Sequence, residues 1–376
     1  MERMDDDAAN PLPRRRAGAA EVGAAGAAGA GAPPAGTPSA GTPGAGRVTA
    51  AMVAREAGVS TATVSLVVSG KAQGRISAAN REKVRAAVER LGYVVDTAGS
   101  TLSKGFSPVV VLVATDIANP FYAELISEAR AALGDRYELL LSVGGPGRQI
   151  DPATIRKLLS LRPAGFLIDA PNAELVAALP PGTRAVLLDA PGLQGGLPSV
   201  NLDVADGAAQ LARHLASQGH RNVGYLDSTI DAATFRVRRE AFRETAAELG
   251  LEVLDGAASL TDIDAAAEAF AAAWPAWGAA GVTAVVGCTD THAYGILGAA
   301  AEAGVAVPRR LAVAGFDDLP YSRHTSPPLT SVSLPSGELG AAAGRTLRAL
   351  IEGGSPEHEH VEVPSRLVAR ASTSRG

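Results

Sequence analysis

TAAMVAREAGVSTATVSLVVS, residues 49–69, decides the fold of the N-terminal part of this chain. Thr49 and Ser60 can each cap a helix, because a hydroxyl accepts hydrogen bonds from the free N–H groups of a first turn. Between them, Gly58 can take the positive φ that a sharp turn requires. Apolar side chains recur at helical spacing in both segments, first as Val53, Ala54 and Ala57 and then as Val64, Val67 and Val68. The stretch therefore predicts two short helices joined by a tight turn.

The predicted second helix leaves small and mostly polar side chains on its outer face. These are Thr61, Ala62, Ser65, Leu66 and Ser69. A third helix is predicted from Ser77 to Leu91, where Gly92 can end it. This order is typical of a helix-turn-helix, whose second helix enters the major groove of DNA. A small helical bundle with solvated charges is the alternative.

Charge is spread unevenly along the chain, although its net value is −5. Residues 47–107 carry nine basic and four acidic side chains, whereas residues 108–376 carry 21 basic and 30 acidic ones. A basic segment joined to an acidic body favours a DNA-binding part over a plain bundle. The candidate contacts to DNA phosphates, which position a protein without reading sequence, are Arg47, Arg55, Lys71, Arg75, Arg81 and Lys83.

Length and composition limit the class of protein. A chain of 376 residues is expected to form two or three folded units. Its one cysteine, Cys288, gives neither an internal disulfide nor a metal framework, which fits a reducing cytoplasm. No apolar run reaches the roughly 18–20 residues of a transmembrane helix. Asp5, Asp6 and Asp7 stand where a signal peptide has basic residues, so neither a membrane partner nor export is expected.

Four segments follow one another along the chain. Residues 1–46 consist almost entirely of Ala, Gly, Pro, Ser, Thr and Arg, and we expect a disordered tail. Residues 47–92 are expected to form the helix-turn-helix part, and residues 93–107 a hinge. Residues 108–376 alternate strand and helix patterns, which indicates an α/β fold with parallel sheets covered by helices.

The pattern of the last segment predicts its elements by range. The predicted strands are 109–114, 137–143, 164–169, 184–189, 222–226, 283–287 and 311–315. The predicted helices are 120–134, 153–161, 204–218, 235–249, 262–273, 291–303 and 337–352. So many units suggest two doubly wound lobes, with a ligand in the crevice beyond the carboxyl ends of the strands.

Several separate blocks of residues stand in an order that points to one family. They are Val48-Thr49, Val53-Ala54, Ala57-Gly58-Val59-Ser60, Thr63-Val64-Ser65, Asn119-Pro120-Phe121-Tyr122, Gly219-His220, Gly315-Phe316-Asp317-Asp318 and Pro327-Pro328-Leu329-Thr330. With these blocks, residues 47–371 resemble the LacI/GalR family of bacterial transcription regulators. The resemblance implies a small all-α head and a two-lobed sensor like the periplasmic binding proteins. It also implies a homodimer that binds a pseudo-palindromic, double-stranded operator DNA.

The resemblance assigns roles to residues of the head and the hinge. It implies that Thr61, Ala62 and Leu66 choose the operator bases and that Leu102 wedges into the minor groove. The expected DNA contacts are Thr49, Ser60, Thr61, Ala62, Thr63, Ser65, Leu66, Arg75 and Leu102. Leu66 stands where relatives often have a polar residue, so readout is expected to depend on thymine methyl groups and DNA shape. Gly99 costs a hinge helix roughly 1 kcal/mol relative to alanine.

Polar and aromatic residues near the predicted strand ends are candidates for binding a small-molecule effector. They are Asp116, Phe121, Tyr122, Asp189, Arg238, Thr289, Asp290 and Asp317. All of these except Asp116 and Asp290 fall on positions where the resemblance implies effector contacts, Asp189 being the weaker candidate. An aromatic ring can stack on a sugar face, while Arg238 and Asp317 can grip hydroxyl groups. From the residues alone, turn capping by Asp317 and a surface ion pair of Arg238 stay open. Thr289 replaces the Asn usual in relatives, so the resemblance does not imply which particular sugar this chain binds.

Motifs of enzymes and cofactor sites do not stand out. The first strand is followed by neither a glycine fingerprint nor a P-loop, and the chain has no His-Glu-x-x-His. No cofactor is therefore expected. Glu357-His358-Glu359-His360 has the composition of a metal cluster, but its Gly- and Pro-flanked position predicts a solvated turn.

The sequence thus favours a ligand-controlled, operator-binding repressor whose effector is a sugar. The expected mechanism is a population shift between arrangements of the two lobes. Two alternatives stay open: control by a nucleobase-type co-repressor, and a cytoplasmic sugar-binding protein that does not bind DNA. A sugar-active enzyme would need a general acid/base pair, which the sequence does not reveal.

Overall fold

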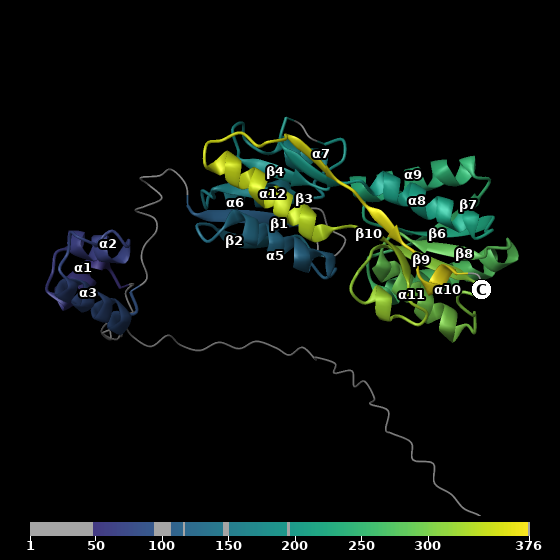
Figure 1. The fold of residues 1–376 in the computed structure, drawn as a ribbon, viewed down its shortest axis with the longest axis horizontal. Helices are drawn as coiled ribbons and strands as arrows, with labels where there is room; N and C mark the ends of the chain where they lie inside the picture. Colours follow the sequence, from purple (N-terminus) through teal and green to yellow (C-terminus); the bar gives the residue numbers. More distant parts are fainter. Residues whose placement is uncertain (1–47, 94–106, 116, 146–149, 194–195, 375–376) are drawn as a thin grey trace, which may run out of the picture. The chain divides into compact units, whose positions relative to one another are not determined.

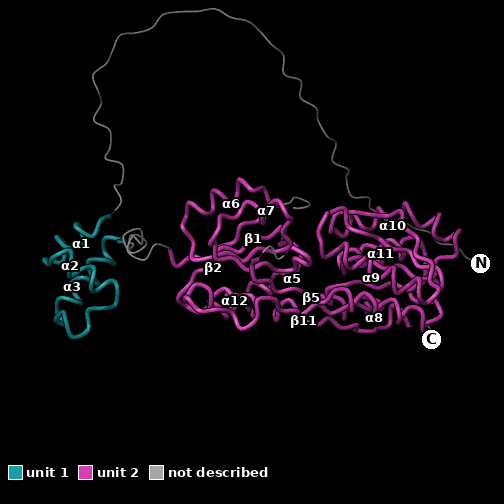
Figure 2. Tube along the Cα trace, turned by 90° about the horizontal axis from the view of Figure 1, so that it is seen from above, with its two compact units in different colours: residues 1–95 teal, residues 96–376 magenta. Residues whose placement is uncertain are grey.

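The computed structural model describes residues 48–93, 107–115, 117–145, 150–193 and 196–374. The chain divides into two compact units, residues 1–95 and residues 96–376 (Figure 2). The predictions for the tail, for most of the hinge with Leu102, and for Arg47 and Asp116 lie outside the described residues.

The described residues of the first unit form three helices. They are α1 (Ala50–Ala57), α2 (Thr61–Val68) and α3 (Ala78–Leu91). Hydroxyl groups cap all three helices at the N-terminal end, where Thr49, Ser60 and Ser77 accept from backbone N–H groups three residues ahead. Gly58 ends α1 with a φ of +64°, as its place in the turn requires. The axes of α1 and α2 differ by 103°, the geometry of a helix-turn-helix.

A small apolar core holds these three helices together. Val53, Val64 and Val84 contribute one fully buried side chain from each helix, and Val59 in the turn packs against them. The predicted inward face of α2 is therefore confirmed at Val64. Within the described residues no single helix is long and apolar enough to span a membrane; α1 and α2 pass that test only as a bent pair.

The second unit consists of two lobes, each built on a six-stranded sheet (Figure 1). The first sheet has the order β11-β5-β4-β3-β1-β2 and the second has the order β12-β10-β9-β8-β6-β7. The strands of the first sheet are β1 (Val109–Ala114), β2 (Glu138–Val143), β3 (Gly165–Asp169), β4 (Ala185–Leu188), β5 (Ser199–Leu202) and β11 (His360–Val363). The strands of the second sheet are β6 (Asn222–Ser228), β7 (Glu252–Ser259), β8 (Ala284–Gly287), β9 (Ala312–Asp317), β10 (Thr330–Ser333) and β12 (Arg366–Val368).

Helices cover both faces of each sheet, as the alternation of strands and helices predicted. The helices of the first lobe are α5 (Phe121–Leu133), α6 (Pro152–Leu159), α7 (Ala173–Ala177) and α12 (Ser336–Ile351). Those of the second lobe are α8 (Val204–Ser217), α9 (Ala233–Glu248), α10 (Ile263–Ala279) and α11 (Asp290–Glu302), with short 3₁₀ turns at Ser322–His324 and Ala371–Thr373. Because side chains alternate along a strand, Val110 and Leu112 of β1 face α5 and α12, while Val111 and Val113 face α6 and α7.

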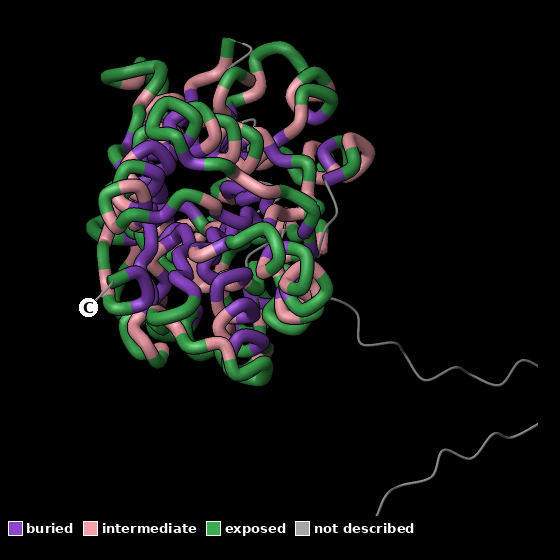
Figure 3. The backbone as a smooth tube through the Cα atoms, turned by 90° about the vertical axis from the view of Figure 1, so that its right-hand side faces the viewer, coloured by how far each residue is buried: buried purple, intermediate pink, exposed green. Residues whose placement is uncertain are grey.

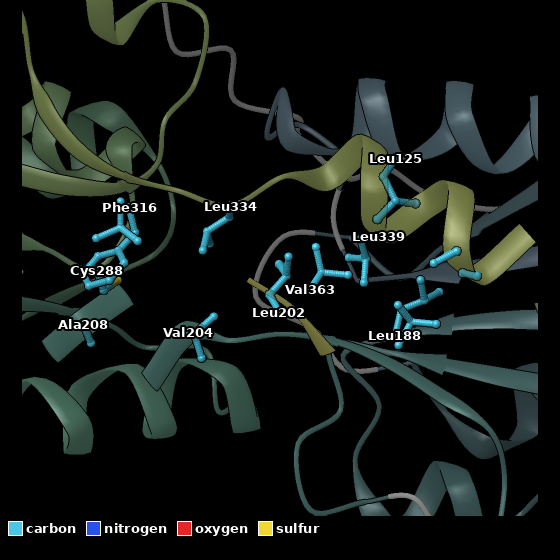
Figure 4. Packing of buried hydrophobic residues seen from close by; sticks show 14 of the residues in the cluster. Leu125, Leu188, Leu202, Val204, Ala208, Cys288, Phe316, Leu334, Leu339 and Val363 are labelled. Atoms are coloured by element: carbon cyan, nitrogen blue, oxygen red, sulfur yellow. The ribbon is translucent and has the colours of Figure 1, made fainter. Parts of the chain in front are cut away.

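The two lobes are joined by three crossings of the chain. The chain leaves the first sheet after β5, returns through α12 after β10, and crosses again between β11 and β12. Leu202, Leu334 and Val363 on these crossings belong to one hydrophobic cluster with side chains of both lobes (Figure 4). Figure 3 shows that buried residues gather in the interior and exposed residues at the surface. This continuity makes the lobes one compact unit.

Several elements were not among the predicted ones. They are α7, β5, β7, β10 and β12. These strands are short or interrupted by polar residues and glycine, as in β10 (Thr-Ser-Val-Ser), so they lack a strong apolar run. The pairing of β10 with β12 is antiparallel, which departs from the expectation of purely parallel sheets.

Candidate functional site

A pocket opens where strands of both lobes end. Asp169 ends β3 and Asp189 follows β4 in the first lobe, while Thr289 follows β8 and Asp317 ends β9 in the second lobe. The pocket encloses about 750 Å³ of atom-free space, its open mouth included. It is lined by Thr115, Asn119, Phe121, Tyr122, Asp169, Ala170, Asp189, Leu202, Ile230, Ala232, Thr234, Phe235, Arg238, Thr261, Thr289, Asp317 and Leu334. A few convergent polar groups among apolar walls are the usual composition of a small-molecule site.

Arg238, on α9, is the central cation of this pocket. Its side chain is only 3% exposed, and its Nη1 donates to the carbonyl oxygen of Cys288 at 2.6 Å. The same nitrogen lies 3.6 Å from Asp317 Oδ1. Its guanidinium also lies over the ring of Phe316, 4.9 Å from the ring centre. A surface ion pair of Arg238, left open by the sequence, is therefore wrong.

Three buried carboxyl groups face the same pocket. Burial raises the pKa of Asp169 to about 7, helped by the charge of Asp189. Burial also raises the pKa of Asp189, although Arg238 opposes the rise. For Asp317, burial raises the pKa to about 6, and Arg238 again acts in the opposite direction. Desolvation thus outweighs the charge of Arg238 at Asp189 and Asp317.

Aromatic side chains close one wall of the pocket. The rings of Phe121 and Tyr122 meet edge to face, with their centres 5.6 Å apart. The hydroxyl of Tyr122 donates to Asp169 Oδ2 at 2.7 Å. This bond holds Asp169 against the start of α5, so the aromatic wall and the carboxyl group form one structure.

Asp290 was expected to contact the effector, and the structure places it elsewhere. Its side chain is fully buried and does not line the pocket. Its carboxylate accepts from the backbone N–H of Leu319 and from the hydroxyls of Ser322 and Ser331. Leu319 and Ser322 lie in the segment after β9 and Ser331 lies in β10, so Asp290 ties that segment to the neighbouring strand. We do not retain it as an effector contact.

The other predicted residues are largely brought together. Phe121, Tyr122, Asp189, Arg238, Thr289 and Asp317 all line the pocket. Thr289 also caps α11, because its hydroxyl accepts from the backbone N–H of His292. Asp169 was missed, although it ends a predicted strand just as Asp317 does. Asn119 was noted in the turn after β1 but was not selected; Thr234 and Phe235, at the start of α9, carried no sequence signal.

Of the residues expected to contact DNA, Thr61, Ala62, Thr63, Ser65 and Leu66 lie on α2, and Ser60 caps it. Thr61, Ala62 and Ser65 are exposed, whereas Thr63 and Leu66 are half-buried. Ser60 accepts from the backbone N–H of Thr63 at 3.2 Å, and the two hydroxyls lie 3.0 Å apart. The cap of α2 therefore already uses part of the hydrogen-bonding capacity of this face. Thr49 and Arg75 are exposed as well.

The acidic and histidine-rich stretch near the C-terminus is partly strand in the described structure. His360 begins β11, and its Nδ1 lies 3.0 Å from the hydroxyl of Ser199. Among the described residues no three His, Cys, Asp or Glu side chains gather closely enough to hold a metal ion. The prediction of a solvated turn is right for residues 357–359, which are largely exposed, but not for His360, which starts a strand.

Comparisons with known proteins agree with this architecture. The model of bacterial regulatory proteins of the lacI family matches residues 51–96, and a periplasmic binding protein-like domain matches residues 212–373. The HTH-type transcriptional regulator GalR of Escherichia coli (strain K12) is 30% identical over 329 residues, which cover 86% of this chain and 94% of the relative. The chain belongs to the LacI family.

Solved structures add the fold of this LacI-family chain. A structure of the lac repressor dimer bound to operator and the anti-inducer ONPF has a TM-score of 0.74 at 23% identity, over 87% of this chain and 99% of the other. The transcriptional regulator CelR in complex with cellobiose has a TM-score of 0.63 at 27% identity, over 87% and 100%. The predicted fold, a helix-turn-helix head with a two-lobed α/β sensor, is thereby confirmed.

Membership of the LacI family determines the class of function of this chain. The relatives are transcription regulators, and the chain carries both the DNA-binding head and the sensor over nearly their whole length. It is a DNA-binding transcriptional regulator with an effector-binding domain. The alternative of a sugar-binding protein without DNA binding is thereby excluded.

Proposed function

We propose that this regulator is a repressor whose binding to operator DNA is controlled by a sugar held in the pocket between the lobes. The observation that carries the proposal is the buried pair of Arg238 and Asp317, 3.6 Å apart, facing a cavity that also holds Asn119 and Asp189. Charged side chains in such pairs offer both donors and acceptors to the hydroxyl groups of one ring. Cellobiose is bound by the similar regulator CelR, which supports a carbohydrate as the ligand.

The pocket favours a sugar over a nucleobase. A nucleobase offers two flat apolar faces, and a site for it is expected to hold parallel aromatic walls. Here Phe121 and Tyr122 stand edge to face, and the lining also carries three carboxyl groups, Arg238 and the ring of Phe235. A nucleobase-type co-repressor remains the second candidate in the binding test below.

Operator reading is assigned to α2 and its neighbours. We infer that Thr61, Ala62, Ser65 and Leu66 meet base edges, and that Ser60, Thr63, Thr49 and Arg75 contact the backbone, with Leu102 as the minor-groove wedge. The exposed outer face of α2 supports this assignment. Because that face is poor in donors, methyl contacts and DNA shape are expected to carry much of the specificity. Such a protein works in the cytoplasm, where bacterial DNA lies.

A homodimer is part of this proposal. β2 is the edge strand of the first sheet, and it exposes the large apolar side chains Leu140, Leu141 and Val143 by 41–46%. An exposed apolar edge strand favours association with another chain. A second copy covering it would give a symmetric assembly for two operator half-sites.

A ligand screen tests the sensor. Full-length protein is heated with single sugars, disaccharides and nucleobases, because a ligand of the folded state raises the melting temperature. We expect a rise with carbohydrates, abolished in Arg238→Met and kept in Arg236→Met, which changes an exposed arginine on the same helix. Stabilisation by nucleobases alone would replace the sugar with the second candidate.

A selection of bound DNA from a random pool tests the other half of the proposal. At low salt, where phosphate contacts are strongest, we expect enrichment of an inverted repeat. The selected DNA should be released, or bound more tightly, when the ligand found in the screen is added. Absence of any enrichment would contradict operator binding.

A further inference from the structure

The charges that line the pocket do not balance. Asp169, Asp189 and Asp317 are 4%, 8% and 8% exposed, and all three face the cavity. Among the described residues of the lining, Arg238 is the single side chain that carries a positive charge. Three carboxyl groups thus share one guanidinium in a space largely shielded from water.

Arg238 is engaged at one end of the pocket. Its Nη1 lies between Asp317 and the carbonyl oxygen of Cys288, and its guanidinium packs over Phe316 and Phe235. These contacts hold the cation on the second lobe, beside Asp317. Asp169 and Asp189 come from the first lobe, where no described lining residue is basic.

Among the described residues, neither of the two remaining carboxyl groups forms an ion pair, although the charge of Arg238 still opposes the rise in the pKa of Asp189. Asp169 accepts one hydrogen bond, from the neutral hydroxyl of Tyr122. Asp189 Oδ1 is buried and has no hydrogen-bond partner within the part of the chain that the structure describes. The charge of Asp189 raises the pKa of Asp169, so the two groups are costly to ionise together. A buried carboxylate without a cation is costly, and it takes up either a proton or a positive ligand group.

We propose that the effector is an amino sugar whose protonated amine lies between Asp169 and Asp189 while its hydroxyl groups meet Arg238 and Asp317. The inference rests on the proposed function, because it assumes that this pocket holds the sugar effector. An ammonium group has three donors and a full charge, so it can donate to Asp189 Oδ1 and offset one of the pair's two negative charges. A neutral hydroxyl donates one hydrogen bond and leaves the negative charge in place.

Binding of matched sugars to the full-length protein tests the inference. Calorimetry at pH 7.5 compares glucosamine, galactosamine and mannosamine with glucose, galactose and mannose and with the three N-acetylated forms. We expect at least one free amine to bind ten times or more tightly than both its hydroxyl and its N-acetyl counterpart. The N-acetyl group keeps the nitrogen but removes its charge, so it separates charge from shape.

Variants assign the preference to the carboxyl pair. Asp169→Asn, and separately Asp189→Asn, should reduce the ratio between amine and hydroxyl forms to threefold or less. Asp135→Asn, an exposed carboxylate of the same lobe, should keep the full ratio. Since the wild-type comparison needs no variant, poor folding of one substitution does not remove the test.

The outcomes distinguish this inference from the proposed function. Neutral or N-acetylated sugars that bind as tightly as the amines would contradict the proposal that the effector carries a charged amine. They would still support a sugar as the effector. An amine preference that survives in both Asp169→Asn and Asp189→Asn would overturn the carboxyl pair as its origin. Failure of every sugar to bind would overturn both proposals.

Discussion

The side-chain amide of Asn119 donates to Asp317 Oδ2 at 3.1 Å, and this bond joins the two lobes across the pocket. The other end of the same amide, Oδ1, accepts from the backbone N–H of Phe121 at 3.0 Å, at the start of α5. Both ends of Asn119 are thus committed, which fixes the direction of the donor. Asp317 also forms the ion pair with Arg238, so one carboxylate contacts side chains of both lobes at the pocket.

Asn119→Asp should loosen the closed arrangement of the lobes. Aspartate can still accept from Phe121, so the start of α5 is preserved, but it faces Asp317 with a second negative charge. A hydrogen bond to a charged group contributes about 1.5–3 kcal/mol, so affinity for the effector is expected to fall about tenfold or more. Calorimetry with a ligand from the screen measures it. Asn172→Asp, which changes the cap of α7 within one lobe, is the control, and equal affinities of the two variants would contradict the interlobe role.

The stability of the ligand-free protein should increase as the pH is lowered from 8 to 6. Burial raises the pKa of Asp169 from 3.8 to about 7, so the folded state holds a proton that the unfolded state has lost. A raised carboxyl pKa means that stability is lost as the pH rises towards that value. The raised pKa values of Asp290, about 8, and Asp317, about 6, act with the same sign, while the lowered pKa values of His292, about 4, and His214 oppose part of the gain.

Asp169→Asn tests how much of this change of stability with pH comes from the pocket. The variant cannot titrate, so the gain between pH 8 and pH 6 should shrink by about 1 kcal/mol. Denaturant unfolding at several pH values measures the difference, and Asp135→Asn should retain the wild-type slope. An unchanged slope in Asp169→Asn would mean that this carboxyl group titrates normally.

Gly340→Ala should destabilise the first lobe. A Cβ at Gly340 of α12 would overlap the backbone carbonyl oxygen of Leu125 on α5, so the two helices would have to separate. Overpacking of this kind costs about 1–3 kcal/mol. Gly298→Ala on α11 is the matched control, because nothing lies within 4 Å of its added Cβ, and it should stabilise by up to about 1 kcal/mol. Thermal unfolding that shows the same shift for both variants would refute the close approach of α5 and α12.

Leu66→Arg should change which operator bases are preferred. An arginine on this face can bind guanine through two hydrogen bonds, with about 1–3 kcal/mol of discrimination against other bases. Selection from a random DNA pool should therefore enrich guanine at one position of each half-site. Ala86→Arg adds the same charge on the exposed face of α3 and should strengthen binding without altering the selected sequence. Identical selected sites for Leu66→Arg and the wild type would show that Leu66 does not face the bases.

Much of the head and many strands of the sensor could be predicted from local patterns. The caps at Thr49 and Ser60, the helix start at Ser77 and the left-handed Gly58 depend on residues within one or two turns of the chain, and all were predicted. The strands with continuous apolar runs, such as β1 and β3, were placed to within a residue or two. β10 and β12 could not be found this way, since their short polar sequences become strands only beside β9.

By itself, the sequence determined the class of protein: a capped helix-turn-helix followed by repeated strand and helix units. It also showed that polar residues gather at strand ends. Only the tertiary structure decided which of them face a ligand. Asp290 and Asp317 both stand beside a strand end, yet the hydroxyls of Ser322 and Ser331 hold the first inside the protein, while Asn119 and Arg238 hold the second at the pocket. Asp169 gained its role from Tyr122 and Asp189, which are distant in sequence. The direction of a side chain and the charge around it depend on such distant partners, and no local pattern records them.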